Sequence, residues 1–292
     1  MNPLQPYLQI LASHFPTLKI SSAEINQYGQ YNDVLIVNNA LVFRFAKVQP
    51  AVETLQYESA LLEHLQGKLP LPIPNPIYQN FDPPSIGSVY MGYQSLPGTP
   101  FWRADFGQIK SLETKKSLAS QLGMFLHQLH QIQLPTALLN SLPQADHLDS
   151  WTNLYERIQT NLFQHMRPDA RQQVSRHFEQ YLSQPDQHQF EPCLRHGDFG
   201  PGNILYDATS LSISGIIDFG GAAVGDPAAD FAGLYISYGE MFYNLCSKVY
   251  PAMASALDRV KFICGTFALQ EAIFGFENGD ESAFQAGMRA YI

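Results

Sequence analysis

Apolar residues in the first part of the chain come in short runs that alternate with polar turns. Val34 to Val37 and Leu41 to Phe45 are β-rich, and Asn38-Asn39 between them favours a hairpin turn. A helix is expected before this hairpin, over Leu8 to Phe15. A second helix is expected after it, over Glu53 to Leu65, where leucines recur at helical spacing. The pattern predicts a small β-rich region with flanking helices.

Beyond Pro97-Gly98 the apolar spacing becomes mostly helical. One stripe runs from Leu118 to Ile132 and another from Trp151 to Leu162, each at the three- and four-residue spacing of one helix face. Short β-rich runs return only at 204–206 and 213–217. After Pro227 the chain is predicted to be helical to its end.

The two regions predict an α+β fold with a small lobe over residues 1–93 and a large, mainly helical lobe over residues 94–292. A strand expected at Val89 to Met91 leads into the crossover, which we place at about 91–98. The proline-dense stretch Leu69 to Pro76 suits neither a helix nor a central strand.

Composition narrows the class of protein. The 292 residues are 45% hydrophobic and 15% charged, which is typical of a well-packed globular chain, and the net charge of -9 argues against nucleic acid or anionic membrane as a partner. Cys193, Cys246 and Cys264 lie far apart and predict reduced thiols. The chain start lacks the features of a signal peptide, and the apolar run Phe262 to Leu269 is too short to span a bilayer. A cytoplasmic protein is expected.

The segment from Arg195 to Gly221 carries the clearest chemistry. Asp198 is followed by Asn203 five positions later and by Asp218 fifteen positions after that. Kinases use this spacing in H-R-D-x-x-x-x-N and D-F-G, where the first Asp takes or orients the proton of the attacking hydroxyl and the Asn and second Asp hold magnesium. Each residue alone fits a turn or a strand end, but the three together predict phosphoryl transfer. Gly197 stands where protein kinases place Arg.

Phosphoryl transfer also requires a fixed positive charge on the nucleotide phosphates. The candidates are Arg44, within the second hairpin strand, and Lys47 at its end; we prefer Arg44, with Glu58 on the next helix as the carboxylate that orients it. Gly29 lies where a phosphate-covering loop is expected, although a single glycine is a weak signal, and Ile217 is a candidate floor for the purine ring. The P-loop motif G-x-x-x-x-G-K-[ST] does not occur in the sequence.

Other polar residues are interpreted as structural. His127 and His130 lie three apart on a predicted helix without a nearby third ligand, so packing is favoured over zinc binding. Asp226 and Asp230 are expected to cap a helix that starts at Pro227 and to support the site.

These motifs resemble those of the aminoglycoside phosphotransferase and choline-kinase-like small-molecule kinases, and most of all the aminoglycoside 2''-phosphotransferases. The resemblance runs through most of the chain. It is carried by Asn38 to Lys47, Tyr57-Glu58 with Leu61-Leu62, Leu122 to His130, Cys193 to Asn203, and Gly215 to Asp230.

The resemblance implies a protein-kinase-like bilobal fold and transfer of the γ-phosphate of ATP or GTP to a hydroxyl of a small, cationic molecule. By family position, Asp198 is the catalytic aspartate, and Asn203 and Asp218 bind Mg²⁺. The nucleotide is expected at the crossover residues Met91, Gly92 and Tyr93.

Two departures bear on the details. These 2''-enzymes usually carry Lys where this chain has Arg44, whose planar fork differs from a point charge. The segment after the DP-x-x-D element is strongly acidic in the aminoglycoside enzymes, whereas Ala232 to Asn244 offers only Glu240. From the C-terminal helices, Glu271 is the second candidate for binding the substrate, followed by Glu277 and Asp280. An aminoglycoside is the leading acceptor; the alternatives are choline, homoserine, a sugar or a macrolide. A nucleotide-binding pseudoenzyme is less favoured, because Asp198 and its two partners are all present.

Overall fold

The computed structural model describes residues 3–27 and 31–292, which form two compact units. The first unit comprises Met1–Phe101, Leu134–Leu142 and Gly202–Ala222, and the second comprises Trp102–Gln133, Pro143–Pro201 and Ala223–Ile292. The first unit thus includes the stretch that carries Asn203 and Asp218, whereas Asp198 belongs to the second. The division into lobes at 93/94 stays a prediction.

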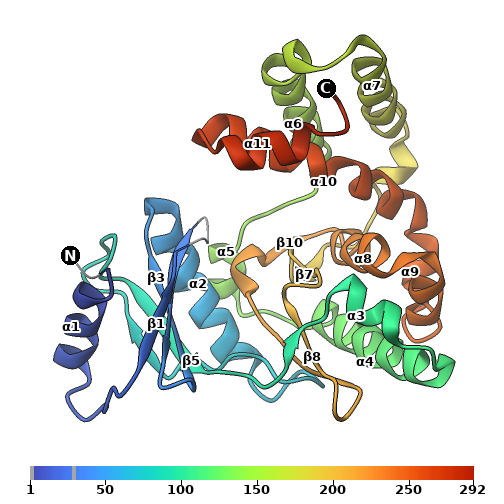
Figure 1. Ribbon diagram of the computed structural model, residues 1–292. Coiled ribbons are helices and arrows are strands. Elements are labelled where there is room, and N and C mark those ends of the chain that lie inside the picture. The colour runs from blue at the N-terminus through green and yellow to red at the C-terminus, as the bar shows by residue number, and fades with distance from the viewer. Residues whose placement is uncertain (1–2, 28–30) are drawn as a thin grey trace. The chain divides into compact units, whose positions relative to one another are not determined.

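The first unit contains a five-stranded antiparallel sheet with the order β1-β2-β3-β5-β4 (Figure 1). Its strands are β1 (Ala23–Asn26), β2 (Asn32–Val37), β3 (Leu41–Ala46), β4 (Tyr78–Asn80) and β5 (Tyr90–Gln94). The predicted hairpin is confirmed, since Asn38 and Asn39 both have φ of 53°, in the left-handed region that asparagine tolerates. β5 confirms the strand expected at Val89 to Met91 and extends beyond it to Gln94, which still pairs with Leu41.

Helices α1 (Gln5–His14) and α2 (Gln49–Leu65) confirm the two helices expected beside this sheet. Strand alternation divides the side chains of β3 between the two faces of the sheet. Phe43 and Phe45 enter a buried cluster that also holds Leu11 of α1. Arg44 therefore points to the opposite face, and α2 packs on β3 and β5 and supplies its partner.

A second, three-stranded sheet of the first unit has the order β6-β8-β9. Its strands are β6 (Thr99–Pro100), β8 (Ile204–Asp207) and β9 (Ser212–Ile216), and α5 (Thr136–Ser141) belongs to the same unit. The amide of Ile217 donates to the carbonyl of Asn203 at 2.9 Å, just before β8 and just after β9. This bond brings Asn203 beside the chain that leads into Asp218.

The second unit is mainly helical. Its longer helices are α4 (Leu112–His130), α6 (Leu148–Asn161), α7 (Pro168–Leu182), α8 (Ala228–Cys246) and α10 (Leu257–Asn278). Shorter elements are α3 (Arg103–Gln108), α9 (Ala252–Ser255), α11 (Glu281–Met288), 3-10 helices at Phe163–His165 and Pro185–His188, and the paired strands β7 (Cys193–Arg195) and β10 (Ala223–Gly225). The stripes that predicted α4 and α6 are buried as expected. Among the residues that the structure describes, no helix has the length and apolar composition needed to cross a bilayer.

Helix α8 is broken inside its length. Gly239 has φ of 81° and ψ of 173°, a backbone conformation that lies outside the helical region and that favours glycine. The first part of α8, up to Tyr238, therefore keeps one helical phase, which does not carry over to Glu240 and the residues after it.

Truncation of Leu126 tests the packing of α4. Leu126 is fully buried, so Leu126→Ala should lower the free energy of unfolding by about 2–5 kcal/mol through lost apolar contact and a residual cavity. Met124→Ala is the control on the same helix, because Met124 is 43% exposed; its change should stay within about 0.5 kcal/mol. Urea denaturation measures both, and equal losses would contradict the assigned face of α4.

Candidate active site

Arg44 is the centre of a buried ion cluster in the first unit. Its Nη1 donates to Glu58 Oε1 at 2.5 Å, and its Nη2 donates to Asp218 Oδ1 at 2.9 Å. Arg44 is 8% exposed and Glu58 is fully buried. A planar guanidinium can hold two carboxylates in this way, whereas the single ammonium of a lysine offers no such fork. The expected pairing of Arg44 with Glu58 is present in the structure.

The charges of this cluster depend on one another. Burial raises the pKa of Glu58 to about 7, although the neighbouring Arg44 acts to lower it. Burial also acts to lower the pKa of Arg44, but the carboxylates of Glu58 and Asp218 outweigh burial and raise it. Arg44 is therefore positively charged at every pH at which the protein is folded.

Lys47 lies in a different environment. Its Nζ donates to the carbonyl oxygen of Gln27 at 3.1 Å and lies 4.0 Å from Asp33 Oδ1. Of the two cations proposed from the sequence, Arg44 contacts Asp218 and Lys47 is held near the end of its own strand.

Asp218 follows β9 in a left-handed conformation, with φ of 64°, and its side chain is 45% exposed. Gly220 leaves space for the carboxylates: a Cβ there would lie 3.2 Å from Asp218 Oδ1 and 3.3 Å from Glu58 Oε2. Tyr57 closes the turn, since its hydroxyl donates to the Gly220 carbonyl at 2.7 Å. The D-F-G turn is thus built so that the aspartate carboxylate lies beside the cation.

Asn203 and Asp218 provide an amide oxygen and a carboxylate within the same unit. These are the hard oxygen donors that Mg²⁺ prefers, and in nucleotide sites the ion usually takes one or two protein ligands together with phosphates and waters. The residues present therefore fit a magnesium ion carried by a nucleotide.

In the second unit a fully buried carboxylate, Asp230, holds the 196–199 loop. Asp230 Oδ2 accepts from the amide of His196 and Oδ1 from the amide of Gly197, both at 2.8 Å. The sequence-based expectation that Asp230 caps α8 is wrong, because its carboxylate accepts from these loop amides. Asp226, just before the N-cap Pro227, accepts from the Ala228 amide at 2.9 Å. Asp230 thus supports the loop that carries Asp198, whereas Asp226 pairs with Arg259 of α10.

His130, which the sequence interpretation assigned to packing alone, holds the carboxylate that anchors this loop. Its Nε2 lies 3.0 Å from Asp230 Oδ2, and its Nδ1 lies 3.3 Å from the hydroxyl of Tyr250. Burial acts to raise the pKa of Asp230, but the hydrogen bond and charge of His130, together with Arg195, outweigh it and lower that pKa. The available sequence signal for this role was Leu129-His130 at the end of the α4 stripe, where no nearby metal ligand accounts for the histidine.

Asp198 is exposed at the tip of this loop. Its amide donates to His196 Nδ1 at 3.3 Å, and the next residue, Phe199, is buried and stacks on Phe125 at 5.7 Å between ring centroids. Gly197 has φ of 85°, a backbone conformation that glycine adopts readily. It would be costly for an arginine, the residue that protein kinases carry at this position. The loop is thus anchored on both sides of an accessible carboxylate.

The remaining predicted residues differ in exposure. Met91, Gly92 and Tyr93 lie on β5 and are buried, Ile217 is partly buried, and Glu240 and Glu271 are exposed on α8 and α10. Gly29 lies outside the described residues. The roles assigned to these residues stay predictions.

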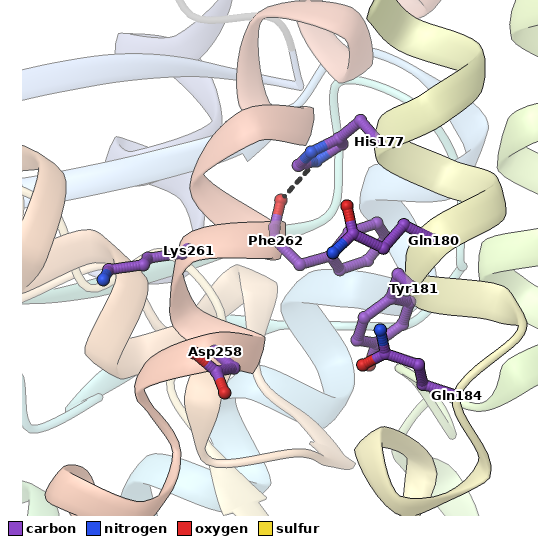
Figure 2. A pocket seen from close by; sticks show the side chains of 7 residues that line it. All are labelled: His177, Gln180, Tyr181, Gln184, Asp258, Lys261 and Phe262. Atoms are coloured by element: carbon purple, nitrogen blue, oxygen red, sulfur yellow. Dashed lines mark hydrogen bonds between the residues drawn. The ribbon is translucent and has the colours of Figure 1, made fainter.

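A cavity of about 450 Å³ lies between α7 and α10 (Figure 2). Its lining is His177, Gln180, Tyr181, Gln184, Asp258, Lys261 and Phe262. The rings of Tyr181 and Phe262 stack at 3.6 Å, and His177 Nε2 lies 2.9 Å from the Phe262 carbonyl oxygen, the bond drawn in Figure 2. None of the residues predicted from the kinase motifs lines this cavity.

Three features together are typical of a kinase-like phosphotransferase. They are the cation paired with the D-F-G aspartate, the Asn that precedes a strand, and the accessible Asp on the anchored H-G-D loop. The comparisons agree: residues 23–259 match the phosphotransferase enzyme family, and the chain belongs to that family.

Three relatives illustrate the similarity. Viomycin phosphotransferase from Streptomyces vinaceus is 26% identical over 302 aligned residues, which cover 100% of both chains. The GDP and kanamycin complex of APH(2")-IIia is 26% identical, with a TM-score of 0.90 over 98% of this chain and 97% of that one. The GDP complex of aminoglycoside 2'-phosphotransferase-IIIa is also 26% identical, with a TM-score of 0.89 over 99% and 97%. The predicted enzyme class and the protein-kinase-like α+β fold are confirmed.

Gly233 of α8 provides a test of how the loop is positioned. A Cβ at Gly233 would lie 2.3 Å from the Phe199 carbonyl oxygen, so Gly233→Ala must displace the residue that follows Asp198. We expect kcat to fall by about 10- to 100-fold, because shifts of this size misalign a reacting group.

The control is Gly107→Ala in α3, where a Cβ meets no atom within 4 Å. This variant should keep the wild-type kcat. Steady-state kinetics on both folded variants measures the difference, and a wild-type kcat in Gly233→Ala would rule out the positioning role.

Proposed function

We propose that the protein transfers the γ-phosphate of ATP or GTP to a hydroxyl of an amine-bearing antibiotic, with the 2''-hydroxyl of an aminoglycoside as the first candidate. The observation that carries this proposal is the similarity, over nearly the whole chain, to an enzyme solved with GDP and kanamycin. The buried Arg44 cluster supports it, because nucleotide phosphates require a cation at this position of the fold.

Asp198 is the group proposed to orient the acceptor hydroxyl and to take its proton. The carboxylate is accessible, and the Asp230 bonds fix the backbone that precedes it. A rigidly held base of this kind lowers the barrier both by positioning the nucleophile and by general base catalysis.

The nucleotide half of the reaction is assigned to the first unit. Arg44, held by Glu58, would bind the nucleotide phosphates, and Asn203 and Asp218 would hold the magnesium ion. When bound, this ion supplies positive charge to the phosphates as the γ-phosphoryl group leaves. The crossover residues Met91, Gly92 and Tyr93, with Ile217, are proposed to lie near the base.

A second candidate is phosphorylation of an antibiotic of another class. Viomycin phosphotransferase matches the whole chain at the same identity as the kanamycin-bound enzyme, so sequence similarity alone does not favour one acceptor. A screen of NDP release with kanamycin, viomycin, a macrolide, choline and homoserine, each with ATP and GTP, separates these candidates. Failure of every acceptor to increase NDP release would reject the proposed function.

Removal of the Asp198 carboxylate tests the chemical step. Asp198→Ala should lower kcat by about 10²- to 10⁴-fold, because the acceptor loses its base. The dissociation constant for the magnesium nucleotide should not change, as isothermal calorimetry can measure. Full activity in this variant would eliminate Asp198 as the base.

A matched pair of variants decides which cation binds the phosphates. Arg44→Met should weaken nucleotide binding by about 10- to 100-fold, the value of a charge-assisted hydrogen bond. Lys47→Met should change it by less than about 3-fold, since Lys47 is held by Gln27 and Asp33. Calorimetry below the melting temperature of each variant provides the comparison; the reverse order would assign the role to Lys47.

A further inference from the structure

One face of α8 leads from the 196–199 loop to an exposed apolar side chain. Asp230 and Gly233 both contact the loop, and residues three and four positions apart share a helix face. Ile236 and Ser237 are the next residues on this face. Ser237 is buried and donates to the Gly233 carbonyl, whereas Ile236 is 46% exposed. Ile236 is therefore about 4.5 Å further along the helix axis than a residue that touches Phe199.

Helix α10 packs against α8 and carries a second stripe of residues. The thiol of Cys264 donates to the Ala232 carbonyl of α8 at 3.5 Å, so this side of α10 faces α8. Phe267, Glu271 and Phe274 follow Cys264 at 3, 7 and 10 positions, the spacing of one helical stripe. The two phenylalanines are partly exposed and Glu271 is exposed.

The acidic residues nearby are mostly engaged elsewhere. Glu277 forms a two-point ion pair with Arg157, with N–O distances of 2.9 and 2.6 Å. Asp280 caps α11 through the Ala283 amide, and Glu281 accepts from Gln285.

Glu240 of α8 and Glu271 of α10 remain, and the described part of the chain shows no ion pair at either. Glu240 follows the break at Gly239 and leaves the helical phase of Ile236. Glu271 is thus the one carboxylate that lies within the stripe formed by Phe267 and Phe274.

We propose that Ile236, Phe267, Glu271 and Phe274 form the acceptor-binding wall, and that it selects an antibiotic with one or two ammonium groups and an apolar face. This inference rests on the proposed transfer to an amine-bearing antibiotic, and it moves the preferred acceptor from aminoglycosides with several amines to antibiotics with one or two. One carboxylate can pair with one ammonium, and the faces of the two phenyl rings can hold apolar surface or a second cation. A polycation would lose hydration on several ammonium groups without gaining partners, which costs binding free energy.

The wild-type selectivity is the first test. Values of kcat/KM are measured for kanamycin, which carries several amines, and for spectinomycin and erythromycin, which carry two and one. We expect the better of the two low-charge acceptors to exceed kanamycin by at least about 10-fold, the scale of one unmatched polar group in a binding site.

Ile236→Glu tests the wall itself. The added carboxylate should raise kcat/KM for kanamycin by about 10-fold and lower it for the low-charge acceptor, mainly through KM. Met124→Glu on α4 makes the same change in charge at a residue that is 43% exposed, and it should leave the ratio of the two values unchanged. Glu271→Gln should raise the KM of the low-charge acceptor about 10-fold with kcat preserved.

The possible failures can be told apart. If no acceptor increases NDP release, the proposed function is rejected. If kanamycin is phosphorylated with a kcat/KM equal to or above that of the low-charge acceptors, the proposed function stands and the wall inference is overturned. An unchanged selectivity ratio in Ile236→Glu would also overturn the inference.

Discussion

In the second unit, the position of the 196–199 loop depends on one buried carboxylate, that of Asp230. Asp230 accepts two backbone amides of the 196–199 loop and is itself held by His130, so α8, α4 and the loop share a single anchor. Two amides and an imidazole meet the hydrogen-bonding needs of a group that burial alone would disfavour. The loop therefore carries an exposed Asp198 on a backbone that has little freedom to move. Gly197 and Gly233 permit the close approach, the first by its backbone conformation and the second by lacking a Cβ.

Much of this fold is readable from the sequence, because local chemistry and hydrophobic spacing agree. Asn38-Asn39 supplies the left-handed turn of a hairpin, and the leucines whose spacing predicted α2 and α4 are buried in the structure. The pairing of Arg44 with Glu58 also follows from local information: strand alternation gives the side of the sheet, and α2 covers that side. The spacing of Asp198, Asn203 and Asp218 predicts the reaction class because kinase chemistry needs all three groups.

Long-range partners are what the sequence does not reveal. That Arg44 reaches Asp218, 174 positions away, depends on tertiary packing that leaves no local signature. The residues around Asp230 in the sequence suggest a helix cap. Only the folded chain shows that the amides of His196 and Gly197 donate to its carboxylate. The break at Gly239 is also hidden, since a single glycine inside a helical pattern is tolerated and does not by itself predict a break. For this reason the count of acidic residues in the sequence is less informative than knowing which of them are already paired, as Glu277 is with Arg157.

The guanidinium of Arg44 also affects which groups of the enzyme change charge with pH. A lysine enclosed by Glu58 and Asp218 would be a titratable base whose charge could change with its surroundings, as buried lysines do. Arginine does not lose its proton in proteins, and these two carboxylates raise its pKa further. Alkaline pH would therefore alter catalysis through other groups and leave the charge at Arg44 unchanged. The cation beside Asp218 is therefore permanent, whereas a lysine there would be titratable.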